Sequence, residues 1–346
     1  MKRLRVAVLT HEDLVPPAST EGYSEKEIQV WKREFGVVRG LRALGHATRV
    51  LGVSDDLMPI RGLVEEWKPD VIFNLLMEFQ DVGSYQVHVV SYLELLNVPY
   101  TGCNPRGILL ARDKRISKQI FRYHRIPSPA FAFYRRGRKV RARRSLHFPL
   151  FVKSVEEEAS FGIAQASVVH DEEGLRERVE FVQRGSGTDA IAEEYVRGRE
   201  LTISVLGNER LSTLPVWELF FKKLPEGTEP IATARVKWDL EYQKKLGIET
   251  GPAKNLPDAT GAQIARIVKR AYRALGLSGY ARMDLRLAED GRAFVIEANA
   301  TPDITYDEDL ALSAKAAGMP YEQLLQRILH LALRYRPPWQ QVRSPA

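Results

Sequence analysis

The sequence predicts an α/β protein in which an N-terminal parallel-sheet domain precedes two α+β subdomains. Strand and helix patterns alternate over the first 100 residues, a compact α+β block follows, and a strand hairpin lies among helices near the C-terminal end. With 346 residues, the chain is long enough for two or three domains. We expect an N-terminal domain over 1–110, a middle subdomain over 111–197 and a C-terminal subdomain over 198–346.

The N-terminal part has the pattern of a Rossmann-like scaffold. We expect strands at 4–10, 47–53, 70–76 and 98–102, and helices at 24–44 and 84–96. Such alternation is typical of a doubly wound parallel sheet. The first strand is followed by THEDLVPP rather than by G-x-G-x-x-G, so the sequence argues against a dinucleotide-binding fingerprint.

The rest of the chain mixes strands and helices. In the middle subdomain we expect a helix at 113–124, strands at 130–134 and 148–153, a strand ending at 169, and a helix from Asp171. In the C-terminal subdomain we expect strands at 199–206 and 213–219, a long loop at 222–257, a helix at 258–276, a hairpin at 279–299 and two final helices.

The net charge of +7 is concentrated in one short stretch. The run RRGRKVRARR, from Arg135 to Arg144, holds seven basic residues and no acid, so the rest of the chain has a net charge of zero. The excess of positive charge is therefore confined to this run. The run also contains no aromatic residue that could stack on bases, so we expect no nucleic-acid partner. Two interpretations stay open: a solvated loop, or a docking patch for an acidic partner or a phosphate-bearing substrate.

Composition also indicates the cellular compartment in which we expect the protein. Cys103 is the single cysteine, which excludes an intramolecular disulfide and suits a reducing environment. No apolar run is long enough to span a membrane, and the short run VAVLT near the N-terminus meets His-Glu-Asp at once. We therefore expect a cytoplasmic protein without a membrane partner.

The segment GYARMDLRLAEDGRAFVIEANA is the most informative part of the sequence. Asp-Gly between two alternating strands is a strong hairpin signal. A two-residue turn at Asp290-Gly291 would place Asp284 opposite Glu297 and Arg282 opposite Asn299, all on one face.

Two carboxylates and an amide oxygen on one face form a set of hard ligands. Such oxygens select Mg²⁺ or Mn²⁺, which commonly share their coordination with substrate phosphates, and Arg282 would add a positive fork. The alternative is a cross-strand network of charged side chains. The sequence has no P-loop, no protein-kinase motif set, no G-x-S-x-G and no His/Cys zinc cluster. This pattern favours phosphoryl transfer from a nucleotide that is held in another way.

A series of further motifs completes a resemblance. It comprises VPYTG, RDKRISKQIFRYHRIPSP, FPLFVKS, ASFGI, EEYVRGRELTISVLGN, LPVWEL, GYARMDLRL, GRAFVIEANATPD and AAGMPYEQLLQRIL. In this order the motifs resemble the ATP-grasp superfamily, within it the branch similar to D-alanine–D-alanine ligases. The resemblance implies a fold in which two α+β subdomains clamp ATP, and a homodimer. It also implies an ADP-forming ligase that joins a small-molecule carboxylate to an amine through an acyl phosphate.

The resemblance assigns roles to individual residues. It implies that Lys114 and Lys153 bind the ATP phosphates, that Glu193, Glu194 and Val196 meet adenine, and that Glu200 binds ribose. It implies that Asp284, Glu297 and Asn299 ligate Mg²⁺ or Mn²⁺ and that Arg282 steadies the reacting centre. Ser160 falls in the loop that covers the phosphates, Glu25 is the candidate acid for the first substrate, and either Lys237 or Lys244 would reach the γ-phosphate.

The substrate half departs from the family pattern. The loop after the first strand is longer, NLLMEFQDVGSYQ has no histidine, Asp303 replaces a glycine, and YDEDL replaces a Ser-Leu pair. The acids could bind an amine-bearing substrate, or they could cap a helix at 308–318. We expect the substrate to differ from D-alanine. The alternatives are a D-alanine–D-alanine ligase proper, phosphotransfer to another acceptor, and a non-catalytic ATP-binding module that docks an acidic partner.

Overall fold

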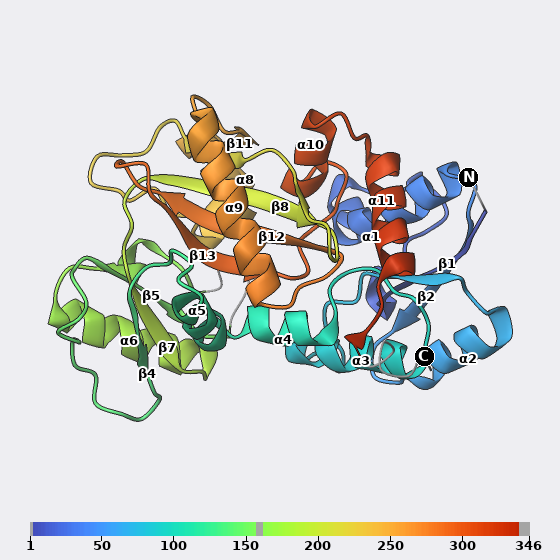
Figure 1. Ribbon diagram of the computed structural model, residues 1–346, viewed down its shortest axis with the longest axis horizontal. Coiled ribbons are helices and arrows are strands. Elements are labelled where there is room, and N and C mark those ends of the chain that lie inside the picture. Colours follow the sequence, from blue (N-terminus) through green and yellow to red (C-terminus); the bar gives the residue numbers. More distant parts are fainter. Residues whose placement is uncertain (1–2, 157–161, 339–346) are drawn as a thin grey trace.

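The computed structural model describes residues 3–156 and 162–338. Figure 1 shows the N-terminal sheet at one end, the middle subdomain at the other, and the C-terminal sheet with its helices between them and above. The helix α4 (Pro105–Arg112) connects these parts, because it contacts α3 (Gln86–Leu95), α5 (Lys114–Tyr123) and β13 (Ala293–Asn299).

The N-terminal domain confirms the predicted parallel sheet. Its strands are β1 (Arg5–His11), β2 (Ala47–Val53) and β3 (Val71–Asn74), in the order β2-β1-β3. Both faces of the central strand are covered, and Val6, Ala7 and Val8 are completely buried. The helix α1 (Glu25–Ala43) begins with a capping box between Ser24 and Glu27. The helix α2 (Met58–Trp67) was not predicted from the sequence.

The middle subdomain has a four-stranded antiparallel sheet covered by α6 (Glu172–Ser186). The sheet order is β4-β7-β5-β6, formed by β4 (Phe131–Tyr134), β7 (Ala190–Glu194), β5 (Leu150–Ser154) and β6 (Val168–Val169). The core between the sheet and α6 includes Ala132, Tyr134, Leu175 and Val179. The other face of the sheet is therefore left for α5 and the site.

The C-terminal subdomain has an antiparallel sheet in the order β11-β10-β8-β12-β13, with β9 (Ser212–Thr213) beside β8. These strands are β8 (Arg199–Leu206), β10 (Trp217–Phe221), β11 (Ile248–Pro252), β12 (Tyr280–Leu287) and β13. The helix α9 (Asp258–Ala274) packs against β8 and β13. The prediction of a long loop at 222–257 is wrong, because this segment contains α7 (Ala234–Trp238), α8 (Leu240–Leu246) and β11.

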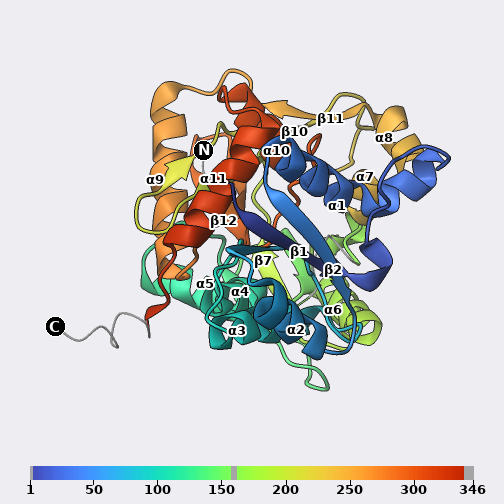
Figure 2. The same cartoon turned by 90° about the vertical axis from the view of Figure 1, so that its right-hand side faces the viewer.

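The last two helices return to the N-terminal domain. They are α10 (Asp309–Ala316) and α11 (Tyr321–Arg334). Figure 2 shows α11 beside α1, and Leu324, Leu325 and Ile328 share a core with Val6 and Val37. Within the described part of the chain, no helix combines the length and the apolar character that a membrane crossing needs.

The hairpin does not turn as predicted. Leu287 pairs with Ala293, the Ala288 N–H donates to the Arg292 carbonyl, and Gly291 has a φ of +81°. This is a three-residue loop with glycine in the left-handed position, rather than a two-residue turn at Asp290-Gly291.

A β-bulge compensates for the longer loop. Asp284 pairs with Glu297, whereas the next residue, Leu285, pairs with Val295, so Ile296 is the extra residue. The bulge restores the register beyond it, and the predicted pairing of Arg282 with Asn299 is confirmed.

We predict that Gly279→Ala lowers the free energy of unfolding by at least about 2 kcal/mol. Gly279 has a φ of +68°, and a Cβ there would lie 2.4 Å from the Gly102 carbonyl oxygen. The control is Gly291→Ala, which has the same strain but no atom within 4 Å of the added Cβ, and it should cost about 1 kcal/mol. Urea denaturation measures both. Equal losses would show that the contact with Gly102 is unimportant.

Candidate active site

The paired strands β12 and β13 form the centre of the site. On β12, the Arg282 guanidinium donates to both carboxylate oxygens of Asp284, with distances of 2.7 Å from Nε to Oδ1 and 3.0 Å from Nη2 to Oδ2. Although burial opposes the shift, Asp284, Asp309 and Glu297 raise the pKa of Arg282. Arg282 therefore stays positively charged among several carboxylates.

On β13, Glu297 and Asn299 face these two residues. Lys114, at the start of α5, places its Nζ 3.7 Å from Glu297 Oε2, and the Lys114 side chain is 5% exposed. Asn299 Oδ1 accepts a hydrogen bond of 2.9 Å from the Thr301 N–H. Two carboxylates and an amide thus converge with two cations on one patch of the sheet.

A buried charge cluster joins the middle subdomain to this patch. Glu193 of β7 lies between two lysines, with 3.0 Å from Oε1 to Lys118 Nζ and 3.3 Å from Oε2 to Lys153 Nζ. Lys118 also donates to the Val295 carbonyl at 3.2 Å, which ties α5 to β13. Burial lowers the pKa of Lys118 to about 8 against the opposing charge of Glu193. Although burial opposes the shift, the two lysines lower the pKa of Glu193.

Lys118 is a site residue that the sequence analysis missed. It follows Lys114 by four positions on α5, and its side chain is completely buried. The spacing of four puts both lysines on one helix face, which was the available signal. The resemblance placed Glu193 at adenine, and the structure shows it as the shared partner of Lys118 and Lys153.

The residues expected near adenine and ribose lie beside this cluster. Glu194 accepts from the His147 N–H at 2.9 Å, and Val196 follows the end of β7. Glu200 of β8 accepts from the Ala232 N–H at 3.2 Å and forms an ion pair of 3.3 Å with Arg286.

An aromatic pair lies next to these residues. The rings of Phe151 and Tyr195 stack at 6.4 Å, Arg286 lies over the Tyr195 ring, and Lys153 lies over the Phe151 ring. Burial raises the pKa of the Tyr195 hydroxyl to about 12, with Arg286 opposing the shift and Glu229 and Glu200 adding to it.

Four predicted residues are not brought into the site by the described structure. Ser160 and the side chain of Lys237 lie outside the described residues. Lys244 is exposed in the last turn of α8, and Glu25 is exposed in the first turn of α1. The choice between Lys237 and Lys244 and the role of Glu25 stay predictions.

Some of the acidic residues that follow β13 pair with residues near them, and others lie at the start of α10, close to the candidate site. Asp303 Oδ1 accepts from the Thr305 N–H and hydroxyl, and Asp307 pairs with Lys32 at 2.5 Å. Glu308 is the N-cap residue of α10 but makes no side-chain cap, and Asp309 lies in the first turn. The helix-terminus interpretation therefore fits the positions of Glu308 and Asp309 but not those of Asp303 and Asp307, and the charge of Asp309 also acts on Arg282.

Repulsion among these acids acts on Glu308. Partial burial, and then the neighbouring charges of Asp303, Asp309 and Asp307, raise the pKa of Glu308 to about 7, with Lys32 acting in the opposite sense. The region beside Arg282 is thus strongly negative, and one of its carboxylates titrates near neutral pH.

The arrangement has the chemistry of a phosphate and metal site. Asp284, Glu297 and Asn299 supply the oxygen donors that Mg²⁺ or Mn²⁺ requires, and the cations now on these carboxylates show that the position attracts positive charge. Lys114 and Lys153 carry positive charge of the kind that pairs with phosphate oxygens, whereas Lys118 is completely buried against Glu193.

Comparisons with known proteins agree with this geometry. A family model described as D-ala D-ala ligase C-terminus matches residues 120–330. The chain is 33% identical over 310 residues to the uncharacterized protein y4sG of Sinorhizobium fredii, with 86% of each chain covered. It is 35% identical over 243 residues to a D-alanine–D-alanine ligase of Bordetella petrii, covering 68% of this chain and 69% of that one.

Solved structures give the same result for the fold. The structure of the D-alanine–D-alanine ligase from Bacillus anthracis complexed with ATP is similar, with a TM-score of 0.71 and 24% identity. The match covers 96% of this chain and 98% of that one. The predicted ATP-grasp fold is therefore confirmed.

We predict that Glu193→Gln lowers the free energy of unfolding by about 3–5 kcal/mol at pH 7, because two buried lysines lose their counter-charge. The control is Glu194→Gln on the same strand. The Glu194 side chain is 31% exposed and its partner His147 is 86% exposed, so the loss should stay below about 1 kcal/mol. Urea denaturation compares the two, and similar losses would contradict the structural role of Glu193.

We predict that Glu308→Gln raises the melting temperature at pH 8 but not at pH 4. The pKa of this carboxyl rises from its ordinary value of 4.5 to about 7 on folding, so its ionisation opposes folding as pH increases through this interval. Glutamine removes that cost. Calorimetry at the two pH values tests this, with Glu322→Gln in the first turn of α11 as the control. An equal gain at both pH values would exclude titration as the cause.

Proposed function

This chain belongs to the family of D-alanine–D-alanine ligases, and on that premise we propose that it is an ATP-dependent ligase that joins a small carboxylate to an amine. The ligase would release ADP and phosphate, and its substrates would differ from D-alanine. Small-molecule substrates, action in the cytoplasm and a homodimer remain parts of this proposal.

One observation carries the proposal. Arg282 and Asp284 on β12 face Asn299 and Glu297 on β13, while Lys114 reaches the same patch from α5. A protein that only bound a nucleotide would not require a metal-type carboxylate pair together with an arginine at this position. The arrangement therefore supports catalysis over a binding module.

The chemistry follows from the charges. The substrate carboxylate would attack the γ-phosphorus of ATP, giving an acyl phosphate and ADP, and the amine would then displace phosphate to form an amide. Lys114 and Lys153 would hold the phosphate oxygens, and Arg282 would stabilise the oxyanion at the reacting carbonyl. Bound by Asp284, Glu297 and Asn299, Mg²⁺ would neutralise phosphate charge. No covalent enzyme intermediate is required.

The acids beside Arg282 support a substrate other than D-alanine. An acceptor such as D-alanine brings its own carboxylate, which would meet Asp309 and, as pH rises through about 7, an ionised Glu308. Lys32 pairs with Asp307 and offsets only part of the charge at Glu308, and Asp303 is engaged by Thr305. We therefore propose an acceptor that presents a cationic amine, and no carboxylate, to this region.

We predict that Glu297→Ala lowers the rate of ADP release at least about 100-fold, because it removes one of two carboxylates that face each other across the hairpin. Glu289→Ala is the matched control, since Glu289 is exposed in the loop of the same hairpin, and its rate should be unchanged. The measurement is ADP release with Mg²⁺ and ATP over panels of carboxylates and amines.

The same panel separates the alternatives. Strong ADP release with D-alanine alone would overturn the proposed substrate and favour a D-alanine–D-alanine ligase proper. A phosphorylated acceptor that accumulates without amide would indicate phosphotransfer. ATP binding with no turnover over the whole panel would favour the non-catalytic module.

A further inference from the structure

The sheet of the middle subdomain ends in an open strand. In the order β4-β7-β5-β6, β4 has β7 on one side and, among the described residues, no strand on the other. β7 separates β4 from β5, which carries Lys153. β7, the neighbour of β4, itself carries Glu193 and Glu194 of the candidate nucleotide site, so the free edge lies one strand away from that site.

The pattern of hydrogen bonds between β4 and β7 shows which backbone groups of β4 face the open edge. The Glu194 N–H donates to the Ala130 carbonyl, so residues 130 and 194 form a hydrogen-bonded pair. Because such pairs alternate along an antiparallel ladder, Ala132 and Tyr134 also direct their backbone groups to β7. The N–H and C=O groups of Phe131 and Phe133 point outward and take no partner among the described residues.

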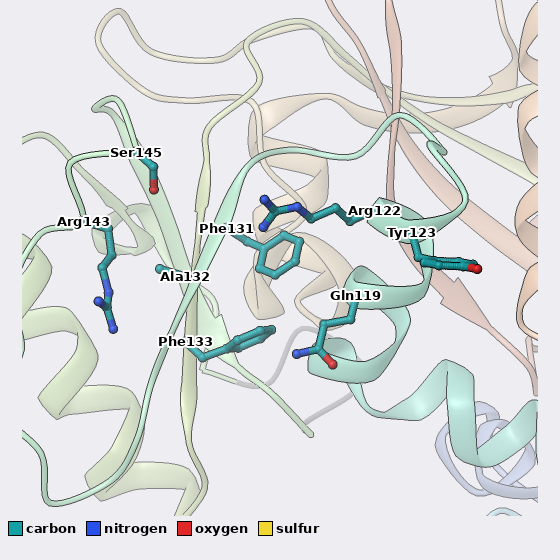
Figure 3. Close-up of a pocket in the computed structure, with 8 residues that line it drawn as sticks. All are labelled: Gln119, Arg122, Tyr123, Phe131, Ala132, Phe133, Arg143 and Ser145. Atoms are coloured by element: carbon teal, nitrogen blue, oxygen red, sulfur yellow. The ribbon is translucent and has the colours of Figure 1, made fainter.

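A groove follows this edge. It has a volume of about 710 Å³, and its walls come from two different segments. Figure 3 shows the rings of Phe131 and Phe133 directed toward Gln119, Arg122 and Tyr123 of α5, with Arg143 and Ser145 across β4 from them. The open backbone groups thus form the floor of a walled groove.

The charged residues that line the groove are all positive. Arg122 and Arg143 line it, and no acidic residue does. Arg143 belongs to the basic run from Arg135 to Arg144, which forms the mostly exposed loop between β4 and β5. Positive charge at an edge discourages pairing with a second copy of the same edge and favours a strand of opposite charge.

We propose that the edge of β4 binds an extended acidic segment of a partner protein as an additional strand. The outward groups of Phe131 and Phe133 would pair with the backbone of the segment, and the two aromatic rings would contact its side chains on one face. Arg122 and Arg143 would pair with its carboxylates. This interaction gives the basic run a role that the proposed ligase reaction does not use.

The probe is a fluorescein-labelled octapeptide of alternating Glu and Val, titrated with the full-length protein without ATP and followed by fluorescence anisotropy. We expect saturable binding that weakens as salt increases, because the pairing involves exposed charges. A Lys-Val octapeptide should not bind. The absence of ATP keeps this result independent of the proposed ligase activity.

Two double variants with the same change in charge test whether peptide binding depends on the groove or on the positive charge of the protein in general. Arg122→Glu/Arg143→Glu should weaken binding at least tenfold. Arg176→Glu/Arg184→Glu is the control, because both residues are exposed on α6, which covers the opposite face of the sheet, and binding should change less than twofold. Unchanged melting temperatures establish that both variants are folded.

Hydrogen exchange tests the strand geometry itself. Peptide binding should slow amide exchange at Phe131 and Phe133, while Ala132, which already faces β7, should change little. Equal loss of affinity in both double variants, or binding without slowed exchange at Phe131 and Phe133, would overturn the proposal. So would the absence of binding at 1 mM peptide (about the weakest affinity of interest), or tighter binding of a single-stranded oligothymidylate to the same groove.

Discussion

The register between β12 and β13 determines the geometry of the site. Arg282 and Asp284 act with Glu297 and Asn299 only while each pair stays directly opposite the other. A slip of one residue would move the side chains of one strand to the opposite face. β8 fixes β12 from its other side, with Asp284 opposite Thr202, so the central strand cannot shift without breaking two ladders. The bulge at Ile296 is therefore part of the geometry of the candidate site, since it restores the register that the three-residue loop would otherwise offset.

Electrostatics links the middle subdomain to that hairpin. Lys114 and Lys118 from α5, and Lys153 from β5, meet Glu193 from β7 and Glu297 from β13. Burial makes each charge expensive in isolation, so the cluster is stable only when its signs are balanced. A triphosphate placed among these lysines would change that balance. The positions of α5 and of the sheet of the middle subdomain are thus coupled to the charge of whatever occupies the site.

Much of the fold was predictable because it follows local patterns. The alternation that defined β1, β2 and α1 depends on residues close in sequence, and the pairing of Asp284 with Glu297 was predicted correctly. The reason given for that pairing was incomplete, because two errors, the turn length and the missing bulge, cancelled. α7, α8 and β11 were missed since short elements carry little periodicity and depend on tertiary packing. Lys118 was missed because its spacing of four from Lys114 indicates a shared helix face but not that the side chain is fully buried against Glu193.

The return of α11 to the N-terminal domain has a consequence for synthesis. Val6 and Val37 belong to the first tenth or so of the chain, yet they complete their core with Leu324, Leu325 and Ile328 near its end. A ribosome would therefore expose an unfinished apolar surface on the N-terminal domain until nearly the whole polypeptide had been made. The first domain to be translated is among the last to be completed, and the middle subdomain, whose core is formed within one continuous segment, can fold ahead of it.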